Sequence, residues 1–264
     1  MRSERRQALW TLGAVAVLIT GAGLAVALVS RSQGSPSPSR ASLPAPGEAA
    51  FVVRHPAKLR ANEHASAWVP VRRAAIARRA PGRRSDAVAR VAELTPEGTE
   101  NIVQVLRRAR RGDGVWLEVR LPAGASGLRG WLPRRVLGGY GFVRTRLVVD
   151  RRRLRATLLR NGRPVFRTAV GVGAPGASTP PGEFYVRNRL TRYASPAYGP
   201  IAFGTSARSD QLTDWPAGGF IGIHGTDRPD LLPGRVSHGC IRMRNGAIRR
   251  LARLMPIGTP VTIR

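Results

Sequence analysis

The chain has 264 residues, and 42% of them are hydrophobic, which is ordinary for a folded protein and excludes disorder throughout. Lys and Arg number 44 against 15 Asp and Glu, so the formal net charge is +29, and nearly all of the cations are arginines. This charge favours polyanionic partners. Because the arginines are scattered along the whole chain and no nucleic-acid-binding motif is present, we expect no nucleic-acid partner. A solvated arginine surface without any partner is the plainer interpretation.

The N-terminus has the pattern of a membrane-targeting segment. Arginines within residues 2–6 precede an uncharged, mostly apolar run from Ala8 to Val29. A helix of this length is about long enough to cross a bilayer of roughly 30 Å. The basic flank marks the cytoplasmic side, so residues 1–30 are predicted to be a signal anchor, with the rest of the chain outside the cytoplasm. A cleaved signal peptide is the alternative, since Ala25–Ala27 resembles a cleavage site.

A linker and a small β domain are predicted next. Residues 31–49 are rich in Ser, Pro and Ala, which is typical of a semi-extended linker. Within residues 50–140, the segment 114–122 alternates apolar and polar side chains as a strand does. A glycine-rich turn follows, and residues 130–137 predict a second strand with a closing half-turn.

This strand pair resembles the last strands of bacterial SH3-like domains, which implies a small SH3-like β-barrel. Trp116 and Trp131 are expected to pack in its core rather than to form a ligand platform. The first half of the region fits less well. Its arginine-rich stretches, residues 72–90 and 96–111, are interpreted as insertions or as a distorted barrel.

The remainder, residues 143–264, predicts a longer and mainly β domain. Strands are expected over residues 146–150, 152–162, 163–173, 178–186 and 261–264. Asn161-Gly162 is a strong hairpin signal, because both residues accept positive φ. Residues 245–255 carry apolar side chains at helical spacing before Pro256, which predicts one short amphipathic helix on the sheet.

Cys240 is the single cysteine of the chain, so it forms no internal disulfide. In an exported protein a lone thiol is a liability unless it is used or deeply buried. Two of the four histidines lie near it in sequence. His224 ends an apolar, strand-like run and precedes Gly225, and His238 stands within the segment Ser237-His238-Gly239-Cys240.

These residue types suit nucleophilic catalysis. A thiol must become a thiolate to attack, and a nearby imidazole can take its proton and later return it to a leaving amine. A tetrahedral oxyanion needs fixed donors, which backbone N–H groups around Gly239 could supply. A cysteine on a tight turn with a histidine beside it would meet all three needs.

At these residues the sequence resembles the L,D-transpeptidase (YkuD-type) catalytic family, whose signature is a His-Gly pair, a variable loop and Ser/Thr-His-Gly-Cys. Residues 178–186, STPPGEFYV, resemble another strand of that family. The resemblance implies that Cys240 is the acylated nucleophile and His224 its base. It also implies that the carbonyl of Gly225 orients the imidazole.

The rest of the motif has implied roles as well. Ser237, His238 and Gly239 fall on the oxyanion side of the site. Many members of the family carry Asn two residues after the cysteine, where this chain has Arg242. Arg242 could bind a substrate carboxylate bidentately, or it could be a solvated surface residue. The resemblance implies no cofactor and no metal.

The resemblance further implies a reaction in the cell wall. Such enzymes attack the third, diamino-acid residue of a peptidoglycan stem, expel the terminal D-alanine and pass the acyl group to a side-chain amine of a second stem, giving a 3→3 cross-link. Stem peptides are then the partners, with anionic cell-wall polymers or lipid headgroups as further candidates. The expected location is the cell membrane, through a single-pass anchor, with the catalytic domain in the periplasm or cell wall.

Three alternatives stay open. The thioester could pass to water, which makes the protein an L,D-carboxypeptidase. The protein could be a non-catalytic wall-binding module with Cys240 merely buried. His224, His238 and Cys240 could instead ligate zinc, although no fourth ligand has typical spacing. Residues 193–202 are also interpreted as a flap over the site.

Overall fold

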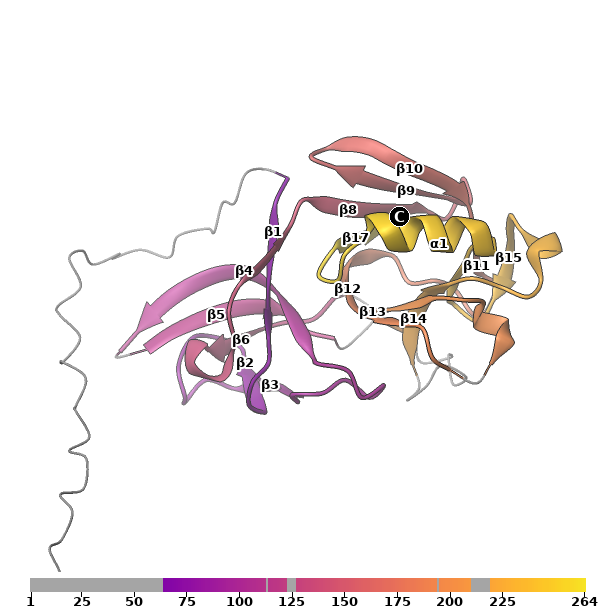
Figure 1. Ribbon diagram of the computed structural model, residues 1–264. Coiled ribbons are helices and arrows are strands. Elements are labelled where there is room, and N and C mark those ends of the chain that lie inside the picture. Colours follow the sequence, from indigo (N-terminus) through magenta and orange to yellow (C-terminus); the bar gives the residue numbers. More distant parts are fainter. Residues whose placement is uncertain (1–63, 113, 123–126, 194, 210–218) are drawn as a thin grey trace, which may run out of the picture. The chain divides into compact units, whose positions relative to one another are not determined.

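Two β-sheets and one α-helix make up the part of the chain that the computed structural model describes, namely residues 64–112, 114–122, 127–193, 195–209 and 219–264 (Figure 1). The mainly β prediction is confirmed. The predicted anchor over residues 1–30, the linker over 31–49 and the first residues of the predicted SH3-like domain lie outside the described residues. Within them, no helix has the length and apolar character needed to cross a membrane.

The first sheet has seven strands in the order β3-β2-β6-β5-β4-β1-β7. The predicted strand pair is confirmed, and the closing half-turn is a short 3-10 helix, η1. The elements of this sheet are β1 (Ser66–Pro70), β2 (Ala75–Arg78), β3 (Ala87–Val91), β4 (Ile102–Arg111), β5 (Gly114–Arg120), β6 (Arg129–Pro133), η1 (Arg134–Val136) and β7 (Gly141–Val143).

The arginine-rich stretches of this region are strands of the sheet, so their interpretation as insertions is wrong. Residues 72–90 contribute β2 and part of β3, and residues 96–111 contribute β4. In β4 the first residues are buried while most of the arginines toward its end are exposed or half-buried. Arginine hides its aliphatic stem while its charge stays in water, so a strand can carry many arginines. Trp116 and Trp131 pack with Ala109, which confirms their core role.

The second sheet has ten strands in the order β10-β9-β8-β17-β12-β13-β14-β16-β11-β15. All of the strands predicted after residue 143 are present, although the stretch 163–173 divides into two. The elements are β8 (Thr145–Asp150), β9 (Arg155–Arg160), β10 (Arg163–Ala169), β11 (Gly171–Gly173), β12 (Gly182–Leu190), η2 (Pro196–Tyr198), β13 (Ala202–Arg208), β14 (Phe220–His224), η3 (Pro229–Leu231), β15 (Gly234–Ser237), β16 (Ile241–Arg242), α1 (Asn245–Leu254) and β17 (Pro260–Ile263).

Strand β12 joins the two halves of the second sheet. Its first residues pair with β17 and its last residues pair with β13, with a register shift between Val186 and Asn188. The hairpin between β9 and β10 turns at Asn161 and Gly162, whose φ angles of 50° and 77° confirm the predicted turn.

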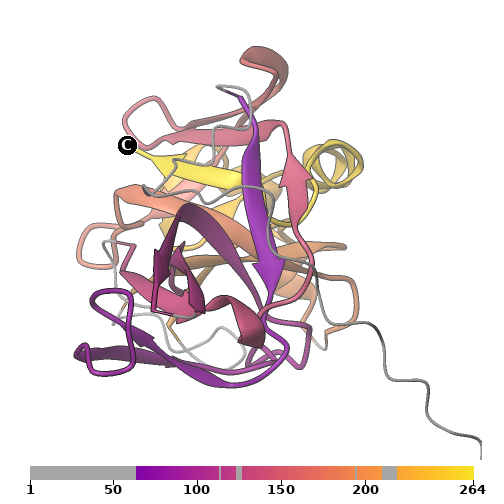
Figure 2. The ribbon, with the colours of Figure 1, turned by 90° about the vertical axis from the view of Figure 1, so that its left-hand side faces the viewer.

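The predicted helix α1 covers the core of the second sheet. Ile248 and Leu251 are fully buried in one cluster with side chains from both halves of the sheet, among them Leu147 and Ile223. Figure 2 views α1 nearly along its axis, beside the strands that it covers. The helical spacing of the apolar residues therefore fixes which face of α1 is buried.

The two sheets meet across β12 and β4. The Tyr185 hydroxyl donates a hydrogen bond of 2.9 Å to the Ile102 carbonyl, and Arg187 forms a 2.8 Å ion pair with Glu97. The side chains of this pair are only 1% and 3% exposed. Burial lowers the pKa of the Arg187 guanidinium, and the negative charge of Glu97 opposes this shift. Removing one partner while the sheets stay packed would leave the other charge buried without compensation.

Replacing Glu97 by Gln should therefore lower the free energy of unfolding by about 3–5 kcal/mol, the cost of an uncompensated buried charge. The matched control is Asp86→Asn, which removes the ion pair between Arg79 and Asp86, whose side chains are 76% and 80% exposed. That change should cost less than about 1 kcal/mol. Urea unfolding of both variants measures the difference, and equal small losses would contradict the role given to the buried pair.

Candidate functional site

Cys240 and His224 come from neighbouring parallel strands. Strands β14 and β16 pair with Ile223 opposite Ile241 and His224 opposite Arg242. Because residues opposite each other in paired strands point to the same face, His224 and Arg242 lie on one face, and Cys240 directly precedes β16. The N–H of Gly222 donates to the Cys240 sulfur at 3.3 Å, which places the thiol beside the strand that ends in His224. The structure therefore brings together the two residues on which the sequence analysis depends.

Both side chains are shielded from water. Cys240 is 4% exposed and His224 is 1% exposed, and Cys240 borders the core cluster of the second sheet. A buried thiolate needs a donor close to its charge, and the Gly222 N–H supplies one. The sulfur is therefore a buried group that a backbone donor holds in place, rather than an exposed thiol.

The His224 ring is oriented by the backbone that follows it. Its Nδ1 lies 2.6 Å from the Gly225 carbonyl oxygen. A carbonyl can only accept, so Nδ1 carries the proton, and the neutral ring has its lone pair on Nε2. The family resemblance implies that the Gly225 carbonyl orients the imidazole, and this contact is the one that such a role requires. The ring edge of Tyr198, in η2, packs against the imidazole with centroids 4.8 Å apart, so the segment interpreted as a flap contacts the histidine.

The turn that carries the cysteine is held by two hydroxyl groups. Gly239 has a φ of 124°, a conformation that side chains rarely adopt. The Ser237 hydroxyl donates to the Cys240 carbonyl at 2.6 Å and accepts from the Gly239 N–H at 3.1 Å. The Thr179 hydroxyl donates to the Gly239 carbonyl at 2.7 Å and accepts from the Gly173 N–H at 2.9 Å. These bonds fix the peptide groups on either side of the nucleophile candidate.

Thr179 and Asn245 are the site residues that sequence reasoning missed. Thr179 lies in the stretch that resembles a family strand, but nothing in its spacing shows that it reaches Gly239. The Asn245 side-chain oxygen accepts a 2.9 Å bond from the Thr226 N–H, just after the catalytic-base candidate. Its position at the start of the predicted helix was the one available signal, since Asn favours helix starts.

Arg242 and His238 have different surroundings. The Arg242 residue is half-buried, and its Nε is buried with no hydrogen-bond partner among the described residues. This guanidinium is therefore not a freely solvated surface group. His238 is exposed on the turn. In the described part of the chain, no three His, Cys, Asp or Glu side chains are grouped as metal ligands.

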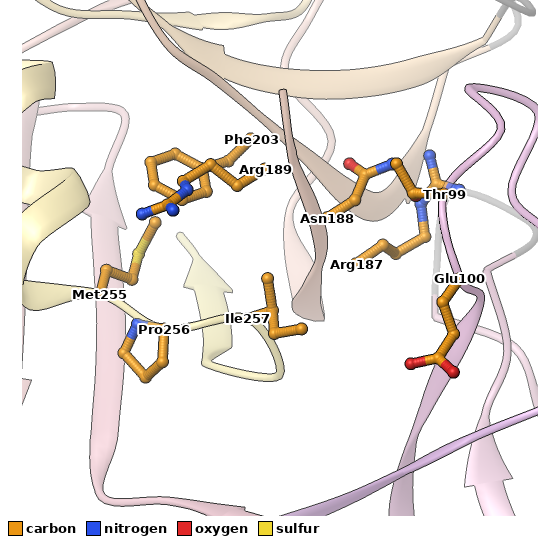
Figure 3. Close-up of a pocket in the computed structure, with 9 residues that line it drawn as sticks. All are labelled: Thr99, Glu100, Arg187, Asn188, Arg189, Phe203, Met255, Pro256 and Ile257. Carbon is orange, nitrogen blue, oxygen red and sulfur yellow. The ribbon is translucent and has the colours of Figure 1, made fainter. Parts of the chain in front are cut away.

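A separate pocket of about 460 Å³ lies where the two sheets meet (Figure 3). Phe203, Met255 and Ile257 form its apolar side, and Glu100 and Arg189 stand at opposite ends. Its charged groups already have partners, since Glu100 pairs with Arg72 and Arg189 bonds the Ala252 carbonyl. Neither Cys240 nor His224 lines this pocket.

Comparison with known proteins gives a family match over the part of the chain that contains the site. Residues 144–263 match the family model of the YkuD L,D-transpeptidase catalytic domain. The Bacillus subtilis (strain 168) protein YkuD, assigned by name to the L,D-transpeptidases, is 36% identical over 107 residues, which are 40% of this chain and 58% of that protein. The B. subtilis protein YqjB, with the same assignment, is 35% identical over 106 residues, covering 36% of this chain and 57% of that protein.

The chain thus spans somewhat over half the length of these curated relatives. Among solved structures, the catalytic domain of the Enterococcus faecium L,D-transpeptidase is 25% identical and covers 46% of this chain and 96% of that one, with a TM-score of 0.36. A TM-score this low supports no geometric comparison. Residues 144–263, which include Ser237-His238-Gly239-Cys240, thus match the L,D-transpeptidase catalytic-domain family that the sequence resembles.

Proposed function

We propose that the chain is an exported peptidoglycan L,D-transpeptidase that forms 3→3 cross-links through a thioester on Cys240. The observation that carries this proposal is the hydrogen bond from the Gly222 N–H, in the strand that ends at His224, to the Cys240 sulfur, together with the contact between the Gly225 carbonyl and the His224 ring. The family match of residues 144–263 supports the reaction class.

The first step acylates the cysteine. His224 Nε2 takes the thiol proton, and the thiolate attacks the carbonyl carbon of the third residue of a tetrapeptide stem. The Gly239 N–H already donates to Ser237, so other backbone N–H groups of this turn are the proposed donors to the oxyanion. When the intermediate collapses, the bond to the terminal D-alanine breaks, and the departing amine takes the proton from His224.

The second step transfers the acyl group. The side-chain amine of a second stem attacks the thioester carbonyl, a new amide bond forms, and the carbon–sulfur bond breaks. The proton lost by the amine returns to the sulfur through His224. We propose that the half-buried Arg242 guanidinium holds a carboxylate of the stem, because a charged group with a buried, unbonded N–H favours an anionic partner.

The proposed location follows from the N-terminus. Residues 1–30 would anchor the chain in the cell membrane with the catalytic domain outside the cytoplasm, where stem peptides are found. Membrane fractionation of cells that express the chain with and without residues 1–30 checks this, and an unchanged membrane fraction after the deletion would exclude the anchor.

Cys240→Ala should abolish adduct formation with a carbapenem, because the sulfur is the acyl acceptor. His224→Ala should slow acylation by at least about a hundredfold, the usual size of a general-base contribution. Intact-mass spectrometry over time measures both variants against the native chain. A native chain that gains no adduct would favour the wall-binding alternative with a buried, inert Cys240.

Thr179→Val should slow carbapenem acylation of Cys240, because the Gly239 peptide loses the bond that orients it. Unfolding free energy should also fall by about 1–3 kcal/mol, since two buried partners lose a hydrogen bond. Thr179→Ser keeps the hydroxyl and should restore most of the rate. If Thr179→Val and Thr179→Ser acylate equally fast, the hydroxyl has no positioning role.

Incubation with a disaccharide-tetrapeptide should release D-alanine and give a cross-linked dimer, read by mass. The transpeptidase assignment requires the dimer. Release of D-alanine with only the disaccharide-tripeptide as product would identify the carboxypeptidase alternative, in which water takes the acyl group. Cys240→Ala is the control, and it should give neither product.

A further inference from the structure

The strands β8, β9 and β10 leave one face of the second sheet uncovered. Along β8 and β9 the inward residues Leu147, Val149, Ala156 and Leu158 are fully buried. Their neighbours alternate outward, and Thr157 pairs with both Val148 and Arg167 across the strands. An antiparallel sheet commonly packs one face and leaves the other in water. Here the outer face is hollowed rather than flat, with a cavity of about 470 Å³ over these strands.

Four exposed arginines line this cavity, and we call it the arginine groove: Arg153, Arg155, Arg167 and Arg264. Its one acidic residue, Asp150, is already engaged. The Asp150 carboxylate accepts hydrogen bonds from the backbone N–H groups of Arg152 and Arg153, and it lies 3.7 Å from the Arg264 guanidinium. These contacts lower the pKa of Asp150, and the bond from the Arg153 N–H contributes most.

One carboxylate, Asp150, lines the groove with four arginines, and its charge interacts with Arg264 and Arg153. Among the described residues, no carboxylate lies within ion-pair distance of Arg153, Arg155 or Arg167. Glu183, on the same face, pairs with Arg146 instead. Guanidinium groups held close together repel one another, and an anion that enters the groove relieves this repulsion and gains charge-assisted hydrogen bonds.

Three observations select the kind of anion. The half-buried Thr157, Val148 and Leu159 line the groove between the arginines, so its surface combines charge with small polar and aliphatic groups. No exposed large hydrophobic residue of the described chain lies on these strands, so the face lacks the apolar anchors with which a protein binds a lipid surface. No aromatic ring lines the groove, so it also lacks the stacking platform of single-stranded nucleic-acid sites.

We propose that the arginine groove binds a phosphodiester-linked anionic polymer of the cell wall. The choice of a wall polymer rests on the proposed wall location, whereas the anion chemistry rests on the groove itself. The groove lies on β8–β10 and involves none of the residues that hold Cys240 or His224. It would keep the enzyme on the wall lattice while the site on β14 and β16 works on stem peptides.

The test measures binding of the full chain to poly(glycerol phosphate) at several salt concentrations. Arg155→Gln combined with Arg167→Gln should weaken binding about tenfold, as for two exposed charge pairs. The slope of log affinity against log salt should become shallower by about 1–2. The matched control is Arg249→Gln with Arg253→Gln, two exposed arginines one turn apart on α1, and it should bind like the native chain.

Other outcomes overturn the proposal. Equal loss in both double variants would mean diffuse attraction to the whole positive surface, and no binding by the native chain would mean no polymer site. Groove-dependent binding to phosphatidylglycerol vesicles but not to poly(glycerol phosphate) would make the partner a membrane. Carbapenem acylation is measured on the same samples. A loss of acylation would contradict the proposed function of Cys240, whereas a loss of polymer binding would contradict only the arginine groove.

Discussion

The site depends on the pairing of two short parallel strands. β14 ends at His224, β16 begins just after Cys240, and the two strands pair side by side in parallel. The Gly222 N–H bond to the sulfur ties the nucleophile candidate to the histidine strand directly. Neither contact is local in sequence, so the rest of the second sheet is needed to hold this register.

The strand β12 connects the sheet that contains the site with the first sheet. Its first half pairs with β17, its second half with β13, and its side chains form the buried bonds to Glu97 and Ile102. Because β13 pairs in turn with β14, the contacts between the sheets lie two strands from His224. The first sheet is therefore held to the second sheet by buried bonds that water cannot easily replace.

Local signals predicted much of this fold. The Asn161-Gly162 turn, the helix before Pro256 and most strands follow from spacing and turn chemistry. The composition of the first sheet was misleading. Its many arginines suggested insertions, whereas these stretches form the strands β2, β3 and β4. The site residues within the His-Gly pair and the Ser237-His238-Gly239-Cys240 segment were predicted because they belong to the family signature. Thr179 was missed because it lies 60 residues from Gly239, and only tertiary folding brings its hydroxyl there.

Asn245 has a consequence for how the site tolerates change. Its side-chain oxygen occupies the space that a Cβ atom would need at Gly199 and equally at Gly225. Three positions on three different segments thus share one small volume. A side chain introduced at either glycine is incompatible with the native asparagine. At Gly199 the added atom would also lie 2.7 Å from the Gly225 Cα, so a smaller residue in place of Asn245 would not by itself make room for it. The two glycines are therefore required by each other's backbone as well as by Asn245.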